Sequence, residues 1–138
     1  MGKVKRFGVS IDAELARRFD KHILSEGYSN RSEALRDLIR EHLITDKLSF
    51  DGTIAVASLS LIYDHHQRDL AEILNHFQHE HHKLIISNLH VHIDHDNCLE
   101  VIIFKGPNNE IKKVADRLAA IRGVKHGKLT MTTTGHGL

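Results

Sequence analysis

Two histidines and the chain's single cysteine lie close together in the second half of the sequence. His90 and His92 are two residues apart in an alternating polar and apolar stretch, so a strand places both imidazoles on one face. The polar segment 94–97 predicts a turn that brings Cys98 back beside them. Two imidazoles and one thiolate are good ligands for Ni(II), Cu(II) or Zn(II). The spacing therefore predicts three ligands of a transition-metal site.

The spacing of these residues does not identify the fourth ligand of the site. Water in that position is typical of a metalloenzyme with a His2Cys site, but no general base or nucleophile constellation accompanies the three ligands. A further histidine is the other choice, and the neighbouring candidates are His79, His81, His82 and His95. Because nine of the 13 histidines lie between His65 and His95, a metal-storage or buffering protein is a further hypothesis.

The elements that must hold these ligands follow from the periodicity of residues 53–138. Period-two stretches predict strands at 53–63, 83–93, 98–105 and 124–134, and apolar residues at helical spacing predict helices at 67–81 and 106–122. The order βαββαβ is the ferredoxin-like pattern. We expect an antiparallel sheet with both helices on one face, and with the other face free to pair with a second copy.

The N-terminal part predicts a strand followed by two helices. Residues 5–11 alternate in polarity, Asp12 is a candidate cap of the first helix, and Gly27 ends that helix. Asn30 is the candidate cap of the second helix. A lone strand needs a partner, and the simplest partner is the same strand of a second copy, which gives a two-stranded ribbon and a symmetric dimer. The segment 46–52 is predicted to be a short hinge.

Composition narrows the function classes without choosing among them. The net charge of +1 means that a DNA-binding surface must be a local patch or must be assembled by oligomerisation. The single cysteine, Cys98, excludes an intramolecular disulfide framework. No apolar run approaches the ~18 residues of a spanning helix, and no signal peptide is visible. We therefore expect a soluble, cytoplasmic protein with no membrane partner.

Several of these motifs together resemble the NikR family of nickel sensors. The segment Leu89-His90-Val91-His92-Ile93-Asp94-His95-Asp96-Asn97-Cys98-Leu99-Glu100 is similar to the metal-binding core of that family, as are Gln78-His79 and Gly123-Val124-Lys125-His126-Gly127. The segment Gly27-Tyr28-Ser29-Asn30-Arg31-Ser32-Glu33 is similar to its ribbon-helix-helix part. The resemblance runs from about Arg6 to Thr133 and implies an α+β chain. The resemblance also implies two domains: a ribbon-helix-helix DNA-binding domain at 1–48 and a ferredoxin-like, ACT-type domain at 53–138.

The resemblance also implies a function and a ligand set. The expected protein is a regulator rather than an enzyme: a nickel-dependent, sequence-specific DNA-binding repressor of nickel-uptake genes. Family members are homotetramers, dimers of dimers, that bind one Ni(II) per subunit. His90, His92 and Cys98 of one subunit would bind it together with His79 of a neighbouring subunit. Glu100 and Gln78 are candidates to orient these ligands. An amino-acid-sensing ACT regulator is a weaker hypothesis because it leaves Cys98 without a role.

In the family the paired strands enter the major groove of a palindromic operator. The outward residues of the strand here are Arg6, Gly8 and Ser10, and Gly8 departs from the polar side chain that is usual there. The second helix would present its N-terminus to a phosphate. The residues at that end are Asn30, Arg31 and Ser32. Arg68 resembles a position that touches DNA without sequence preference, and Glu33 and Asp37 resemble a secondary cation site.

Overall fold

The computed structural model describes residues 2–67 and 69–138. By its internal contacts the chain forms two compact units, one ending at His42 and the other beginning at Leu43. The boundary lies within helix α2 (Arg31–Leu48). The α+β class of the chain is confirmed. In the described part of the chain, no helix is both long enough and apolar enough to span a membrane.

The first unit contains α1 (Ala13–Ser25) and most of α2, and both ends of α1 and the start of α2 are those that the sequence predicts. The Asp12 side chain accepts hydrogen bonds from two backbone N–H groups in the first turn of α1. Gly27 follows α1 with a φ of 86°, a left-handed conformation that costs glycine little. The Asn30 side chain accepts a 3.0 Å hydrogen bond from the Glu33 backbone N–H, as an N-cap does.

The predicted strand at 5–11 is absent from the single chain, where residues 2–12 have no regular secondary structure. The physical reason is that a strand's N–H and C=O groups need a neighbouring strand, and the first unit offers none. Phe7 and Val9 remain 71% and 60% exposed. An apolar groove of about 310 Å³ lies nearby. It is lined by Val9, Ile11, Leu15, Ala16, Phe19, Arg31, Leu35 and Leu38.

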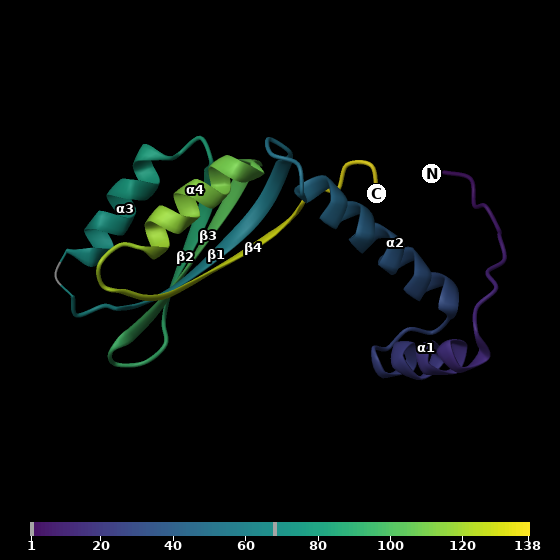
Figure 1. Cartoon of the computed structure of the whole chain (residues 1–138). Helices are drawn as coiled ribbons and strands as arrows, with labels where there is room; N and C mark the ends of the chain where they lie inside the picture. Colours follow the sequence, from purple (N-terminus) through teal and green to yellow (C-terminus); the bar gives the residue numbers. More distant parts are fainter. Residues whose placement is uncertain (1, 68) are drawn as a thin grey trace. The chain divides into compact units, whose positions relative to one another are not determined.

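The second unit is a four-stranded antiparallel sheet with strand order β2-β3-β1-β4. Its elements are β1 (Ile54–Asp64), α3 (Leu70–Glu80), β2 (Ile85–His92), β3 (Asn97–Pro107), α4 (Asn108–Ala119) and β4 (Val124–Thr133). Both helices lie on the same side of the sheet (Figure 1). The predicted βαββαβ order and ferredoxin-like arrangement are confirmed, and the element ends differ from the predicted ones by a few residues.

The core of the second unit lies between the sheet and its two helices. Alternate residues of β1 are buried, from Ala55 to Tyr63, and so are alternate residues of the facing strand β3, from Cys98 to Phe104. The other face of the sheet keeps apolar side chains in solvent, including Leu89, Val91 and Ile93. The helix-covered face therefore forms the core, and the second face of the sheet has no covering element within the described chain.

The predicted hinge at 46–52 is wrong in its first half, because α2 continues to Leu48. Buried Asn108 explains the order of the turn that follows. Its side-chain amide donates to the carbonyl groups of Leu48 and Phe50, and its oxygen accepts from the Gly52 backbone N–H at 2.9 Å. The turn is thus bonded to the start of α4 and is not a free linker.

Candidate metal centre and DNA-contacting segment

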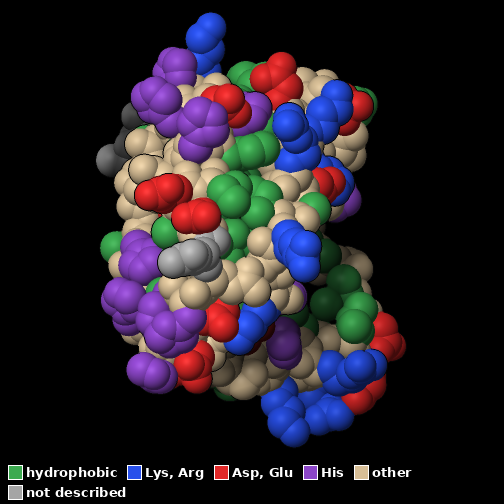
Figure 2. Space-filling model, turned by 90° about the vertical axis from the view of Figure 1, so that its left-hand side faces the viewer, with side chains coloured by type: hydrophobic (Ala, Val, Ile, Leu, Met, Phe, Trp, Pro, Cys, Tyr) green, Lys and Arg blue, Asp and Glu red, His purple; other side chains and the backbone are tan. Residues whose placement is uncertain are grey.

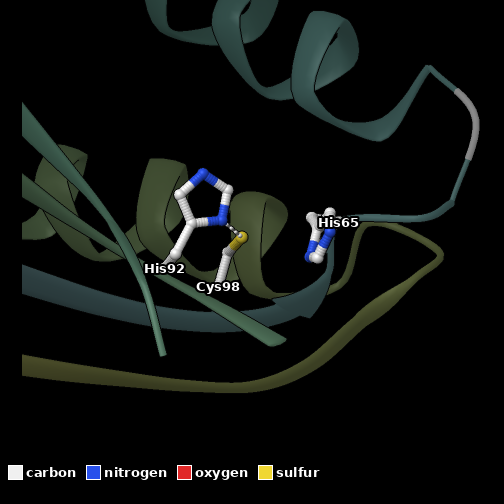
Figure 3. Close-up of side chains that lie close together, drawn as sticks. All are labelled: His65, His92 and Cys98. Carbon is white, nitrogen blue, oxygen red and sulfur yellow. Dashed lines mark hydrogen bonds between the residues drawn. The ribbon is translucent and has the colours of Figure 1, made fainter. Parts of the chain in front are cut away.

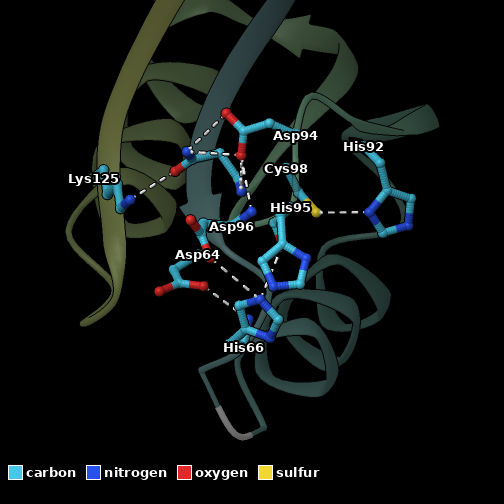
Figure 4. A network of polar contacts seen from close by, with 9 residues as sticks. Asp64, His66, His92, Asp94, His95, Asp96, Cys98 and Lys125 are labelled. Atoms are coloured by element: carbon cyan, nitrogen blue, oxygen red, sulfur yellow. Dashed lines mark hydrogen bonds and ion pairs between the residues drawn. The ribbon is translucent and has the colours of Figure 1, made fainter.

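The β2–β3 hairpin positions the predicted metal ligands. In its register His92 lies opposite Cys98 and His90 lies opposite Glu100, so all four side chains are on the helix-covered face. The turn is fixed by Asp94, whose carboxylate accepts hydrogen bonds from two backbone N–H groups at 2.8 and 2.9 Å (Figure 4). These hydrogen bonds lower the pKa of Asp94. The hairpin therefore holds its two histidines in a fixed relation to the cysteine.

His92 and Cys98 are in direct contact. His92 Nδ1 lies 3.4 Å from Cys98 Sγ (Figure 3). Cys98 is completely buried, and this burial raises the pKa of its thiol, with a smaller contribution from nearby carboxylates. Without a metal ion the sulfur is a neutral thiol at pH 7, and it has to lose its proton to bind one.

A third side chain that could bind a metal in the same place is His65, which the sequence pattern did not single out. Ligand atoms of His65, His92 and Cys98 all lie within 4.8 Å of one another (Figure 3). His65 follows β1, and its backbone N–H donates to the Asp96 carbonyl, which holds it against the hairpin turn. Its Nδ1 atom is buried and has no hydrogen-bond partner within the described residues. A buried nitrogen of this kind, beside an imidazole and a thiol, fits a bound divalent metal of the nickel or zinc type.

His90 is held in a different way from His65. Its Nδ1 atom lies 3.0 Å from the Tyr63 hydroxyl, which also donates to Glu100 at 3.5 Å. Burial, with Glu100 nearby, raises the pKa of Tyr63, so the hydroxyl keeps its proton. Gln78 donates to Glu100 at 2.8 Å, so this network links β1, α3, β2 and β3. With Nδ1 engaged, Nε2 is the nitrogen of His90 that remains for a metal.

The other candidate histidines lie apart from this group. His79 is exposed on α3, and His81 stacks against Phe77 with ring centroids 4.6 Å apart. Within the described chain, no ligand atom of His79, His81, His82 or His95 belongs to the cluster formed by His65, His92 and Cys98. The single chain therefore gathers three potential ligands, His65, His92 and Cys98, and the predicted role of His79 would require a second copy.

The exposed histidines His66 and His95 form a further group at the hairpin turn. This group adjoins the first one, because ligand atoms of Asp64, His65 and His66 also lie within 4.8 Å of one another. His66 Nε2 lies 2.9 Å from the His95 carbonyl oxygen and 3.5 Å from Asp96 Oδ1 (Figure 4). Figure 2 shows histidine side chains gathering in groups on one face, with acidic side chains beside them. These contacts give His66 a partner in the protein itself, in contrast to the buried nitrogen of His65.

Those residues predicted to contact DNA that the structure describes are all exposed. Arg6, Gly8 and Ser10 belong to the segment without regular structure, and open space surrounds the α-carbon of Gly8. Arg31, which with Ser32 starts α2, pairs with Asp20 through two hydrogen bonds of 2.7 Å. This pair lowers the pKa of Asp20. Arg68 lies outside the described residues.

Glu33 and Asp37, the pair predicted to form a secondary cation site, each accept a hydrogen bond from a hydroxyl. Ser29 Oγ donates to Glu33 at 3.0 Å, and Tyr28 Oη donates to Asp37 at 2.8 Å. The latter bond raises the pKa of Tyr28. Both carboxylates are on one side of α2 and have oxygen atoms left to accept further contacts.

Family models match both units of the chain. The model described as "NikR C terminal nickel binding domain" matches residues 56–132, and the model described as "Ribbon-helix-helix protein, copG family" matches residues 5–46. The first match covers more than half of the chain and includes every predicted nickel ligand.

Full-length relatives agree with the family models. A protein of Geobacter sulfurreducens named as a nickel-responsive regulator is 53% identical over 138 residues, covering 100% of this chain and 99% of the relative. A protein of the same name from Nitratidesulfovibrio vulgaris strain Miyazaki F is 47% identical over the same shares. An uncharacterised protein of Thermotoga maritima has a similar fold, with a TM-score of 0.50 and 15% identity over 56% of this chain and 96% of that one.

Proposed function

We propose that this chain, which belongs to the NikR family of nickel-responsive regulators, binds a palindromic operator when it holds Ni(II) and so represses nickel-uptake genes. The observation that carries the proposal is the contact of His92 with Cys98 on paired strands, in a chain that also has a ribbon-helix-helix segment. Because its target is DNA, we place its action in the cytoplasm.

In the proposed centre, one Ni(II) per subunit is bound by His90, His92 and Cys98 of one copy and by His79 of a neighbouring copy. Bound nickel would supply a rigid centre that joins two copies, since low-spin Ni(II) favours four ligands in a plane. The residues of this chain do the rest. Tyr63 contacts Nδ1 of His90, so Nε2 of that imidazole is free to bind the metal. Burial of Cys98 keeps water from its sulfur. Exposed His79 on α3 is available to another copy, so nickel would order that helix.

The proposed assembly is a homotetramer built as a dimer of dimers. In the first unit, Phe7 and Val9 and the groove beside α1 are apolar and uncovered, which suits pairing with the same segment of a second copy. In the second unit, Leu89, Val91 and Ile93 occupy the sheet face opposite the helices and are 60%, 40% and 52% exposed. Two separate self-complementary surfaces are what a dimer of dimers requires.

The proposed DNA contacts divide into base readout and phosphate binding. Arg6 and Ser10 of the paired strands would contact base edges in the major groove, while Gly8 would read no base. The N-terminus of α2, with Asn30, Arg31 and Ser32, would bind a phosphate through free N–H groups. Glu33 and Asp37 would place two negative charges near this phosphate. A cation bound between the two carboxylates would neutralise them.

Selection of genomic fragments by the full-length protein tests the function. The selection is run with Ni(II), with Zn(II) and with chelator, and a Cys98→Ala variant is run beside the unchanged chain. We expect one palindromic site to be enriched only by the unchanged chain and only with Ni(II). Equal enrichment of the site under all conditions would mean that the metal has only a structural role. No enrichment, together with metal uptake, would favour a metal-storage or buffering protein.

A further inference from the structure

We propose that Arg117 on α4 is a positioning residue for His79, and that it acts through the ring of Phe77 on α3. In this proposal Arg117 holds the last turn of α3, the turn that carries His79, before any metal binds. The proposal rests on the proposed function in one respect, the assignment of His79 as a nickel ligand. The contact of Arg117 with α3 and its effect on the order of that helix do not depend on the assignment.

The core supports α3 less than it supports α4. The buried residues of α3 are Leu70, Leu74 and Gln78, whereas α4 buries five residues. At the N-terminus of α3, Asp69 has a left-handed backbone with a φ of 67°, and its side chain makes no capping hydrogen bond. A helix of 11 residues without such a cap is marginal by itself, because isolated helices of this length are not stable in water. Side-chain contacts at the other end of α3 are therefore important for its order.

Those contacts are made by Phe77 and Gln78 in the last turn. The guanidinium carbon of Arg117 lies 5.0 Å from the centre of the Phe77 ring, within the range of a cation–π interaction. Phe77 is half-buried against the core, and α3 and α4 lie on the same side of the sheet (Figure 1). Gln78 donates to the buried carboxylate of Glu100 at 2.8 Å. The last turn is thus held by α4 through Phe77 and by the sheet through Gln78.

The surroundings of Arg117 leave its charge to the Phe77 ring. The carboxylate next to it in sequence, that of Asp116, pairs with Lys112 at 2.9 Å. The Phe77 ring is also in contact with His81, with ring centroids 4.6 Å apart, so a second contact fixes its position. Arg117 is exposed, and a cation–π interaction at an exposed site changes an equilibrium constant by about two- to fivefold. We expect effects of that size rather than a complete loss of order.

The consequence concerns His79, which directly follows Gln78 and is exposed. The apparent affinity for a ligand is scaled by the fraction of molecules that are already in the conformation that binds it. Arg117 raises the fraction in which the turn that carries His79 is in place, so loss of Arg117 should weaken nickel binding. Charge repulsion alone predicts the opposite, because removal of a positive side chain favours the binding of a cation.

Hydrogen exchange and nickel affinity of the full-length protein test the proposal together. In Arg117→Gln, the backbone amides of residues 76–80 should exchange about two- to fivefold faster in the metal-free protein, and nickel affinity should fall by a similar factor. Competition with a chelator measures the affinity. Arg117→Lys keeps a cation and should restore much of both values. Lys113→Gln removes the same charge from another exposed position of α4 and is the matched control, which should change neither value.

A double-mutant cycle shows whether Arg117 acts through His79. In a His79→Ala background, Arg117→Gln should have no further effect on nickel affinity, while its effect on hydrogen exchange should persist. An equal loss of affinity with and without His79, unchanged exchange in Arg117→Gln, or tighter nickel binding by that variant would each overturn the proposal. An unchanged nickel affinity in His79→Ala alone would instead count against the proposed nickel centre, and the exchange rates would still show whether Arg117 orders α3.

Discussion

The Tyr63 hydroxyl lies between His90 Nδ1, at 3.0 Å, and the buried carboxylate of Glu100, at 3.5 Å. Since the hydroxyl donates to Glu100, it accepts from the protonated Nδ1 of His90, and this leaves Nε2 with its lone pair. The buried Tyr63 hydroxyl therefore selects the tautomer of His90, which lies on the edge strand β2.

Tyr63→Phe is the first prediction that follows from this relationship. The ring still fills the core, but His90 loses the contact that fixes its orientation and tautomer. We expect nickel affinity to fall by about 10–100-fold, the usual effect of losing a group that orients a metal ligand. Competition with a chelator of known affinity measures it. Tyr28→Phe, a change at the hydroxyl bonded to Asp37, is the matched control and should leave nickel affinity unchanged.

Glu100 carries the second prediction, because three side chains donate to it. Gln78 and Asn88 donate at 2.8 and 3.1 Å, and Tyr63 donates to its other oxygen. Glu100→Ala leaves these donors in a buried site without their acceptor, which costs about 2 kcal/mol of the free energy of unfolding. Denaturant titration of the metal-free protein measures the loss. Glu100→Gln keeps one acceptor oxygen and should cost less; equal losses for the two variants would show that packing alone matters.

The third prediction concerns pH and nickel. Burial raises the pKa of the Cys98 thiol, so the metal-free protein carries this proton at neutral pH and must release it when nickel binds. Affinity for nickel should therefore rise by about tenfold per pH unit between about pH 7.5 and 8.5, above the ordinary titration range of imidazole. Calorimetry in buffers of different ionisation enthalpy counts the protons released. A flat affinity, with no proton released, would mean that the sulfur is already a thiolate.

The elements of the second unit were predictable from sequence because each buries one side of a regular pattern. The alternation in 53–63 and 98–105 corresponds to β1 and β3, whose every second residue is buried. The end of α2 was not predictable in this way. Its last turn is polar, and its continuation depends on hydrogen bonds from Asn108, which is distant in sequence.

The metal site was predictable only in its local part. His92 and Cys98 are brought together by a short turn, so their contact follows from spacing. His65 directly follows a different strand, β1, and its position depends on the pairing of Asp64 with Asn97, a register that spacing does not reveal. The strand at 5–11 is the reverse case, because it was predicted from its sequence pattern but does not form in the single chain. Its hydrogen-bond partner, a second strand, is not present there.

The fourth prediction concerns the packing of α4 on β4 at Gly127. A β-carbon at this position would lie 2.7 Å from the Ala119 β-carbon and 3.2 Å from the Leu61 side chain. Gly127→Ala should therefore push α4 away from the sheet and destabilise the chain by about 1–3 kcal/mol, the usual cost of overpacking. Thermal unfolding measures the change. Gly8→Ala, at a glycine with open space around it, should have no such effect on stability.

The last prediction separates the two arginines proposed to contact DNA. Arg6 is proposed to read a base, so Arg6→Ala should lower affinity for the operator by about 1–3 kcal/mol and relax the preference at one position of each half-site. Arg31 is proposed to contact a phosphate, so Arg31→Ala should weaken binding to all sequences alike and reduce the salt dependence by about one unit per contact. Fluorescence anisotropy with operator and scrambled duplexes at several salt concentrations distinguishes the two effects. Asp20→Asn removes the carboxylate that holds Arg31 and should strengthen binding to both duplexes. If Arg31→Ala instead changed sequence preference, the assignment of the α2 N-terminus to the phosphate backbone would be wrong.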